Sequence, residues 1–93
     1  SAGLLHSYIH SGRIGVLLDI RCETDFVAKT DNFQTLAHEL AMHIAAMAPE
    51  SVDALLNQEY VRNSSQKIDE LVKKSITQLG ENIKVERFCR YEL

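Results

Sequence analysis

Apolar and polar residues alternate along residues 14–22, as they do in a β-strand with one buried face. The apolar positions of this run are Ile14, Val16, Leu18, Ile20 and Cys22. Residues 4–9 also have the character of a strand, whereas residues 1–3 are expected to be a frayed start. Ser11-Gly12 separates the two strands and suits a two-residue hairpin turn, because Gly12 tolerates a positive φ.

The predicted turn fixes which residues of the two strands face each other. It pairs Ile9 with Ile14, Ser7 with Val16 and Leu5 with Leu18, and it places these pairs on the core face. The opposite face then carries His6, Tyr8 and His10. This stripe of rings is either an ordinary solvated face with some ring stacking or a second contact surface.

A helical pattern follows the hairpin. Apolar residues recur at helical spacing at Phe33, Leu36, Ala37, Leu40, Ala41, Ile44 and Ala45. Asp31 and Gln34 have the spacing of a capping box. The helix is expected to end near Met47, before Pro49.

The last third of the chain predicts one more helix and one more strand, after a connector over residues 48–65. The helix is expected to begin near Ser64 or Ser65 and to end at Gly80. In the strand that follows, Ile83, Val85, Cys89, Tyr91 and Leu93 alternate with polar residues, and Arg87 and Phe88 break the pattern. The order β-β-α-α-β predicts an α+β fold, with a three-stranded antiparallel sheet covered by two main helices. Residues 1–93 are expected to form a single domain.

Composition narrows the possible functions. The chain is 45% hydrophobic and 25% charged, with a net charge of −3, so it has no basic surplus for nonspecific nucleic-acid binding. No apolar run is long enough to span a membrane, and residues 1–10 do not resemble a signal peptide. Cys22 and Cys89 are either reduced and packed as small hydrophobic side chains or disulfide-bonded, within the chain or across a dimer.

The stretch Glu23-Thr24-Asp25-Phe26-Val27 joins the second strand to the long helix. Thr24 can cap a short helical turn over residues 25–29, and Asp25 suits its N-terminus. Periodicity alone favours Phe26 as a core residue beside the helix start. Alternatively, the stretch is a binding determinant on a loop that two rigid elements hold in place.

Motifs for catalysis are missing from the sequence. His38 and His43 are five positions apart, roughly 140° around a helix, and so do not share the face that a zinc-binding helix requires. The four glycines are scattered, and neither a phosphate-binding loop nor a G-x-S-x-G elbow is present. These observations favour a domain that acts by binding, not an enzyme.

Four segments, in order along the chain, resemble the elongation factor Ts family. The most specific is the T-D-F-V signature of residues 24–27, followed by Ala28-Lys29 and Phe33. Residues 6–17 resemble the core hairpin of that family, residues 41–49 its long helix, and residues 79–93 its last helix-to-strand segment. The connector, residues 50–63, is the weakest part of the resemblance.

The resemblance implies guanine-nucleotide exchange on GDP-bound elongation factor Tu, without covalent chemistry and without a cofactor or metal. The Thr24, Asp25, Phe26 and Val27 segment would bind the partner and dislocate its Mg²⁺. Leu79 and Gly80 match a second partner contact, and His10 matches a third.

The resemblance also sets expectations about size and assembly. The small helical domain with which the family normally begins is absent, so we expect this chain to be a truncated core. Short members with a single core unit tend to pair, so we expect a homodimer that uses the last strand or the His/Tyr face, with Cys89 contributing to dimer stability.

Two other functions stay open. The domain could be a dimerisation or scaffold module that binds elongation factor Tu without promoting exchange, and a metal hydrolase is the less favoured enzyme alternative. No nucleic-acid or membrane partner is expected. The expected location is cytoplasmic, with the matrix of a mitochondrion or plastid as the alternative.

Overall fold

The structure is a computed structural model that describes residues 2–93. As predicted, two strands come first, helices follow, and one strand comes last. The elements are β1 (Ala2–His10), β2 (Ile14–Cys22), α1 (Asp25–Ala28), α2 (Asp31–Met47), α3 (Val52–Asn57), β3 (Glu59–Tyr60), β4 (Asn63–Lys67), α4 (Ile68–Leu79) and β5 (Lys84–Glu92).

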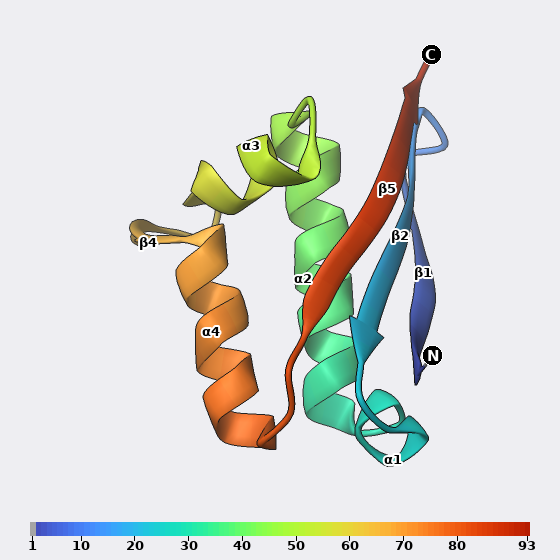
Figure 1. Ribbon diagram of the computed structural model, residues 1–93. Helices are drawn as coiled ribbons and strands as arrows, with labels where there is room; N and C mark the ends of the chain where they lie inside the picture. The colour runs from blue at the N-terminus through green and yellow to red at the C-terminus, as the bar shows by residue number, and fades with distance from the viewer. Residues whose placement is uncertain (1) are drawn as a thin grey trace.

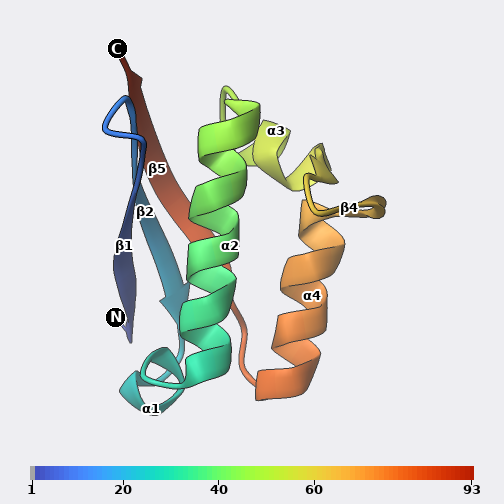
Figure 2. The same ribbon diagram turned by 180° about the vertical axis from the view of Figure 1, so that it is seen from behind.

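The main sheet is three-stranded and antiparallel, with the strand order β1-β2-β5. Helices α2, α3 and α4 lie on one side of this sheet, and α1 lies at the end of the sheet where β2 ends (Figures 1 and 2). Helix α2 contacts β1 and β2 directly, and α4 packs against α2. The predicted α+β fold, a three-stranded antiparallel sheet with two main helices, is therefore confirmed.

The predicted register of the β1–β2 hairpin is wrong by one residue. Ser11 and Gly12 do adopt positive φ values of 52° and 66°, but Arg13 is an additional loop residue and His10 pairs with Ile14. A shift of one residue moves every side chain of a strand to the other face of the sheet. His6 and Tyr8 therefore lie on the α2 side, and Leu5 and Ile9 lie on the side without helices.

The start of β1 is ordered rather than frayed. Ala2 pairs with Cys22 and Gly3 with Arg21, while Ser1 lies outside the described residues. Gly3 has a φ of 156°, and a Cβ at this position would lie 2.3 Å from the Ile20 carbonyl oxygen. Only a glycine allows the two strands to approach so closely here.

Helix α2 extends over the predicted residues, but its cap differs from the prediction. The N-cap is Thr30, whose Oγ1 accepts a hydrogen bond from the Phe33 N–H at 3.2 Å, and Asp31 is the first residue of the helix. The other end closes at Ala48, which adopts a left-handed conformation before Pro49. The buried stripe of α2 matches the predicted apolar positions and adds His43.

The connector is more regular than the sequence suggested. It contains α3 and a small hairpin of β3 and β4, and residues 64 and 65 belong to β4. Helix α4 therefore begins at Ile68, later than predicted. Its first turn is capped by Glu70, whose Oε1 accepts the Lys67 N–H at 2.8 Å, and Gly80 closes its end with a φ of 74°.

Strand β5 changes face partway along its length. The pairing shifts between Asp19–Arg87 and Ile20–Val85, which leaves Glu86 as an extra residue in β5. A bulge of this kind reverses the alternation of side chains. It explains why Arg87 and Phe88 break the sequence pattern, and it corrects the prediction that Val85 and Cys89 share a face.

We call the side of the sheet that faces away from α2 the outer face. Its apolar side chains are Leu5, Ile9, Leu17, Cys89 and Tyr91, all of which are exposed. Its charged residues form one cluster, in which Arg21 Nε donates to Asp19 Oδ1 at 2.6 Å and Arg87 Nε donates to Asp19 Oδ2 at 3.0 Å. Hydrogen bonds from Arg21 and Arg87 hold the pKa of Asp19 at about 2.

Candidate partner-binding surface

The turn between β2 and α2 holds a large aromatic side chain in solvent. Thr24 caps α1 by accepting the Val27 N–H at 3.2 Å, as the sequence predicted. Val27 and Ala28 are buried in the core, whereas the Phe26 side chain between the cap and these two residues is 81% exposed. Periodicity alone favoured a core position for Phe26, and that interpretation is wrong.

The carboxylate of Glu81, in the loop between α4 and β5, binds this turn directly. Glu81 Oε1 accepts the backbone N–H groups of Glu23 and Thr24, at 3.1 and 3.0 Å, and Oε2 accepts the Thr24 hydroxyl at 2.6 Å. In return, Glu23 Oε2 accepts the Asn82 N–H at 2.6 Å. The hydrogen bond from the Thr24 hydroxyl is the largest cause of the lowered pKa of Glu81.

These hydrogen bonds bring two of the predicted contact segments together. Leu79 and Gly80, at the C-terminal end of α4, directly precede the residues that bind the turn. Leu79 is half-buried and Gly80 is exposed. Glu23 belongs to the stretch that the sequence analysis offered as a binding determinant, but Glu81 was not identified, since a polar residue in a turn carries no distinguishing signal.

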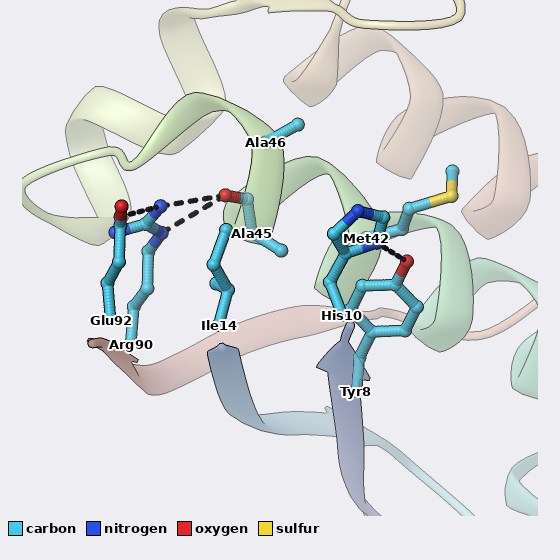
Figure 3. Close-up of a pocket in the computed structure, with 8 residues that line it drawn as sticks. All are labelled: Tyr8, His10, Ile14, Met42, Ala45, Ala46, Arg90 and Glu92. Carbon is cyan, nitrogen blue, oxygen red and sulfur yellow. Dashed lines mark hydrogen bonds and ion pairs between the residues drawn. The ribbon is translucent and has the colours of Figure 1, made fainter. Parts of the chain in front are cut away.

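His10 lies elsewhere. It is at the far end of β1, roughly 30 Å along the hairpin from the turn at Thr24. It is exposed, its Nδ1 lies 3.0 Å from the Tyr8 hydroxyl, and it lines a cavity of about 450 Å³ between the sheet and the end of α2 (Figure 3). On the opposite side of this cavity, Arg90 donates to the Ala45 carbonyl oxygen and pairs with Glu92.

The cysteine beside the turn, Cys22, is shielded from solvent. The Cys22 thiol is buried and donates to the Thr24 carbonyl oxygen at 3.3 Å. Burial raises the pKa of this thiol, and the carboxylates of Glu81, Asp25 and Glu23 act in the same direction. Cys22 is therefore a poor nucleophile and serves the turn as a packing residue.

The two helical histidines have separate structural partners. His43 is fully buried, with Nε2 at 2.9 Å from Gln58 Oε1, and its Nδ1 accepts the Val61 N–H at 3.2 Å. His38 is exposed, and its Nδ1 lies 3.3 Å from His6 Nε2. Over residues 2–93, no group of three or more potential metal-ligating side chains gathers at one point. Within the same range, no helix combines the length and the apolar character needed to cross a membrane.

An exposed aromatic side chain on a turn that the core and a carboxylate both hold is available for contact with another protein. Comparison with known proteins identifies the family of the chain. Residues 23–93 match the sequence profile of the family described as Elongation factor TS. The chain belongs to the elongation factor Ts family.

Individual relatives agree with this assignment. Elongation factor Ts of Coprothermobacter proteolyticus is 38% identical, with 100% of this chain and 71% of the relative covered. That of Moorella thermoacetica is 34% identical, with 100% and 68% covered. That of a Nostoc species is 44% identical over 98% of this chain, which spans only 29% of that relative.

The alignments also show a difference in length between this chain and two of these relatives. The first two extend over 139 positions although this chain has 93 residues, so about 46 positions of those relatives have no counterpart here. The Nostoc alignment needs only 92 positions.

The name of the family, Elongation factor TS, indicates a role in translation elongation.

Proposed function

We propose that this domain promotes the release of GDP from elongation factor Tu. In this proposal, Thr24, Asp25, Phe26 and Val27 bind the GTPase domain of the partner, and Phe26 enters between its structural elements. The exposure of Phe26 is the observation that carries the proposal. A large apolar side chain that the fold keeps in water while its neighbours are buried is available to a partner without any rearrangement of the core.

The physical basis of the proposed step is the way proteins hold GDP. The nucleotide is bound largely through its phosphates and a Mg²⁺ ion. A side chain that displaces the elements around the ion weakens this binding, and no covalent step is required. By thermodynamic linkage, GDP must weaken the binding of the exchange factor by the same factor.

Two further contacts complete the proposed interface. Leu79 and Gly80 lie beside the turn that carries residues 24–27, which we call the signature turn. They would extend the same contact area. His10 is too far away to belong to that area, and we assign it to a separate contact with the same partner. The exposed ring of His10 and the cavity beside it support this assignment.

The direct test follows a fluorescent GDP analogue as it leaves elongation factor Tu. Exchange activity predicts a release rate that rises with the concentration of the domain. Binding without faster release would identify the alternative function, a scaffold or dimerisation module. Absence of binding would contradict both functions.

We also propose that two copies of the chain pair through the outer face of the sheet. This face exposes Leu17, Tyr91 and Leu5 side by side, and the helices cover only the other face. Its charged cluster does not oppose burial, because the Asp19 carboxylate already accepts hydrogen bonds from Arg21 and Arg87. The His/Tyr stripe, the other expected dimer surface, lies on the side of the sheet that faces α2, so we place the dimer contact on the outer face instead.

Sedimentation equilibrium tests the proposed pairing. Leu17→Lys places a charge at the centre of the outer face and is expected to yield monomers, whereas Val61→Lys in the connector leaves the association unchanged. Cys89 lies opposite Leu17 and would be buried in the same interface. If Cys89→Ala leaves the dissociation constant unchanged, Cys89 does not stabilise the dimer.

Since the relatives named above are bacterial proteins, we propose the bacterial cytoplasm as the place of action.

A further inference from the structure

We infer that Glu81 is a positioning residue for the signature turn, and that it acts together with Glu23 to fix Phe26 and the end of α4 as one rigid contact surface. This inference rests on the proposed exchange function. It concerns a pair of residues that do not themselves need to touch the partner.

The contacts are reciprocal and connect distant parts of the chain. One carboxylate, from Glu81, accepts three hydrogen bonds from Glu23 and Thr24, which are 58 and 57 positions away in the sequence. The other carboxylate, from Glu23, accepts the Asn82 N–H, next to Glu81. We call these four hydrogen bonds the carboxylate clamp. Because each segment binds the backbone of the other, neither can shift alone.

The clamp adds to the restraints that packing and local hydrogen bonds place on this short turn. Helix α1 has only four residues, far fewer than an isolated helix requires for stability. Phe26 contributes no core contact, so its position depends on Val27, Ala28 and the Thr24 cap. The cap depends in turn on Glu81, since the Thr24 hydroxyl donates to Glu81 and accepts from Val27.

The clamp also gathers negative charge. Glu81, Glu23 and Asp25 all raise the pKa of the Cys22 thiol, so all three carboxylates lie near its sulfur. Repulsion between like charges opposes the clamp, and the backbone N–H groups and the Thr24 hydroxyl compensate the charge of Glu81. Charge-assisted hydrogen bonds are the strong kind, which suits them to holding like charges together.

The chemistry of the carboxylate distinguishes three variants. Wild-type Glu81 accepts all three hydrogen bonds through two oxygens. Glu81→Gln keeps one acceptor oxygen for the two backbone N–H groups, but its amide NH₂ cannot accept the Thr24 hydroxyl. Glu81→Ala loses all three. The expected order of GDP release rates is therefore wild type, then Glu81→Gln, then Glu81→Ala.

The matched control is Glu70→Ala at the other end of α4. Glu70 also carries a carboxylate that accepts a backbone N–H, from Lys67 at 2.8 Å, and it lies far from the turn along the helix. Any general effect of removing a carboxylate near an end of α4 appears in both alanine variants. An effect specific to the turn appears only in Glu81→Ala.

Two readouts test the clamp. GDP release from elongation factor Tu is expected to slow at least about tenfold with Glu81→Ala, because the loss of even one hydrogen bond to a charged group corresponds to about tenfold or more. Amide hydrogen exchange in the free domain is expected to accelerate about tenfold at Val27 and Ala28, and not in β2. With Glu70→Ala, neither the release rate nor the exchange at Val27 and Ala28 should change.

Two results would overturn the inference. One is unchanged exchange at Val27 and Ala28 in Glu81→Ala. The other is acceleration by an equal factor throughout β2 and α2, which would make Glu81 a general structural residue. Phe26→Ala is measured in parallel. If it does not slow GDP release, the proposed function fails, and the amide exchange alone decides whether the clamp exists.

Discussion

Helices α1 and α2 begin in the same way, but the phenylalanine of α1 is exposed whereas that of α2 is buried. Each starts with a Thr-Asp pair, and each threonine accepts the N–H of the third helical residue at 3.2 Å. That third residue is buried in both helices, as Val27 in α1 and Phe33 in α2. The second residue is exposed in both, and it is Asn32 in α2 but Phe26 in α1.

The comparison shows why Phe26 is in solvent. The cap fixes the direction of the first helical turn, and the second position of that turn points away from the core in both helices. Asparagine is an ordinary residue for such a position, whereas phenylalanine usually avoids it. The exposure of Phe26 thus follows from the register of its cap, and binding is the reason we assign for a phenylalanine there.

The largest expected effect compares the two phenylalanines directly. Phe33→Ala leaves a cavity in the core and is expected to lower the free energy of unfolding by about 3–5 kcal/mol. Phe26→Ala removes no core contact, so its effect should stay within about 0.5 kcal/mol. Urea denaturation of both variants measures the difference. A loss above 2 kcal/mol with Phe26→Ala would show that Phe26 is part of the core.

The two capping threonines give a smaller and sharper comparison. Thr30→Ala removes the cap of a long helix and also the hydrogen bond from Thr30 Oγ1 to the Val27 carbonyl oxygen. It should lower the global free energy of unfolding by about 1 kcal/mol. Thr24→Ala should act mainly on the exchange of the Val27 amide, because α1 can open without disrupting the core. Equal effects on global stability would mean that α1 and α2 unfold together.

The smallest effect is expected in acid and concerns the buried histidine of α2, His43. Burial lowers the pKa of His43, while its hydrogen bond to Gln58 acts in the opposite direction. A group whose pKa is lower in the folded state binds fewer protons there, so the free energy of unfolding should fall as the pH drops below 6.5. His43→Gln should reduce this slope, and the slope that remains includes His6, whose pKa is lowered by burial and by His38. A His43 pKa at or above 6.5 in an NMR titration would contradict the assignment.

Much of the fold could be predicted from the sequence, because hydrophobic periodicity is strong in β2, α2 and β5. The errors arose where one additional residue changed a register. Arg13 in the hairpin loop reverses the predicted direction of the side chains of β1, and Glu86 reverses that of the β5 residues that follow it. A pattern of apolar and polar residues does not reveal such an insertion.

The candidate surface could be predicted only in part. The resemblance pointed to Asp25 and Phe26, although periodicity alone placed Phe26 in the core. The carboxylate clamp could not be predicted, since it joins residues nearly 60 positions apart whose proximity depends on the whole fold. The β3–β4 hairpin was missed because its anchors, such as the hydrogen bond from Val61 to His43, are also long-range.

The most direct test of the central claim is the rate of GDP release from elongation factor Tu in the presence of Phe26→Ala. Met47→Ala is the matched control, because Met47 is a large exposed apolar residue at the opposite end of α2. We expect Phe26→Ala to slow the stimulated release at least about tenfold, as for an interface hot spot, and Met47→Ala to leave it unchanged. Wild-type stimulation by a folded Phe26→Ala domain would contradict the role of Phe26.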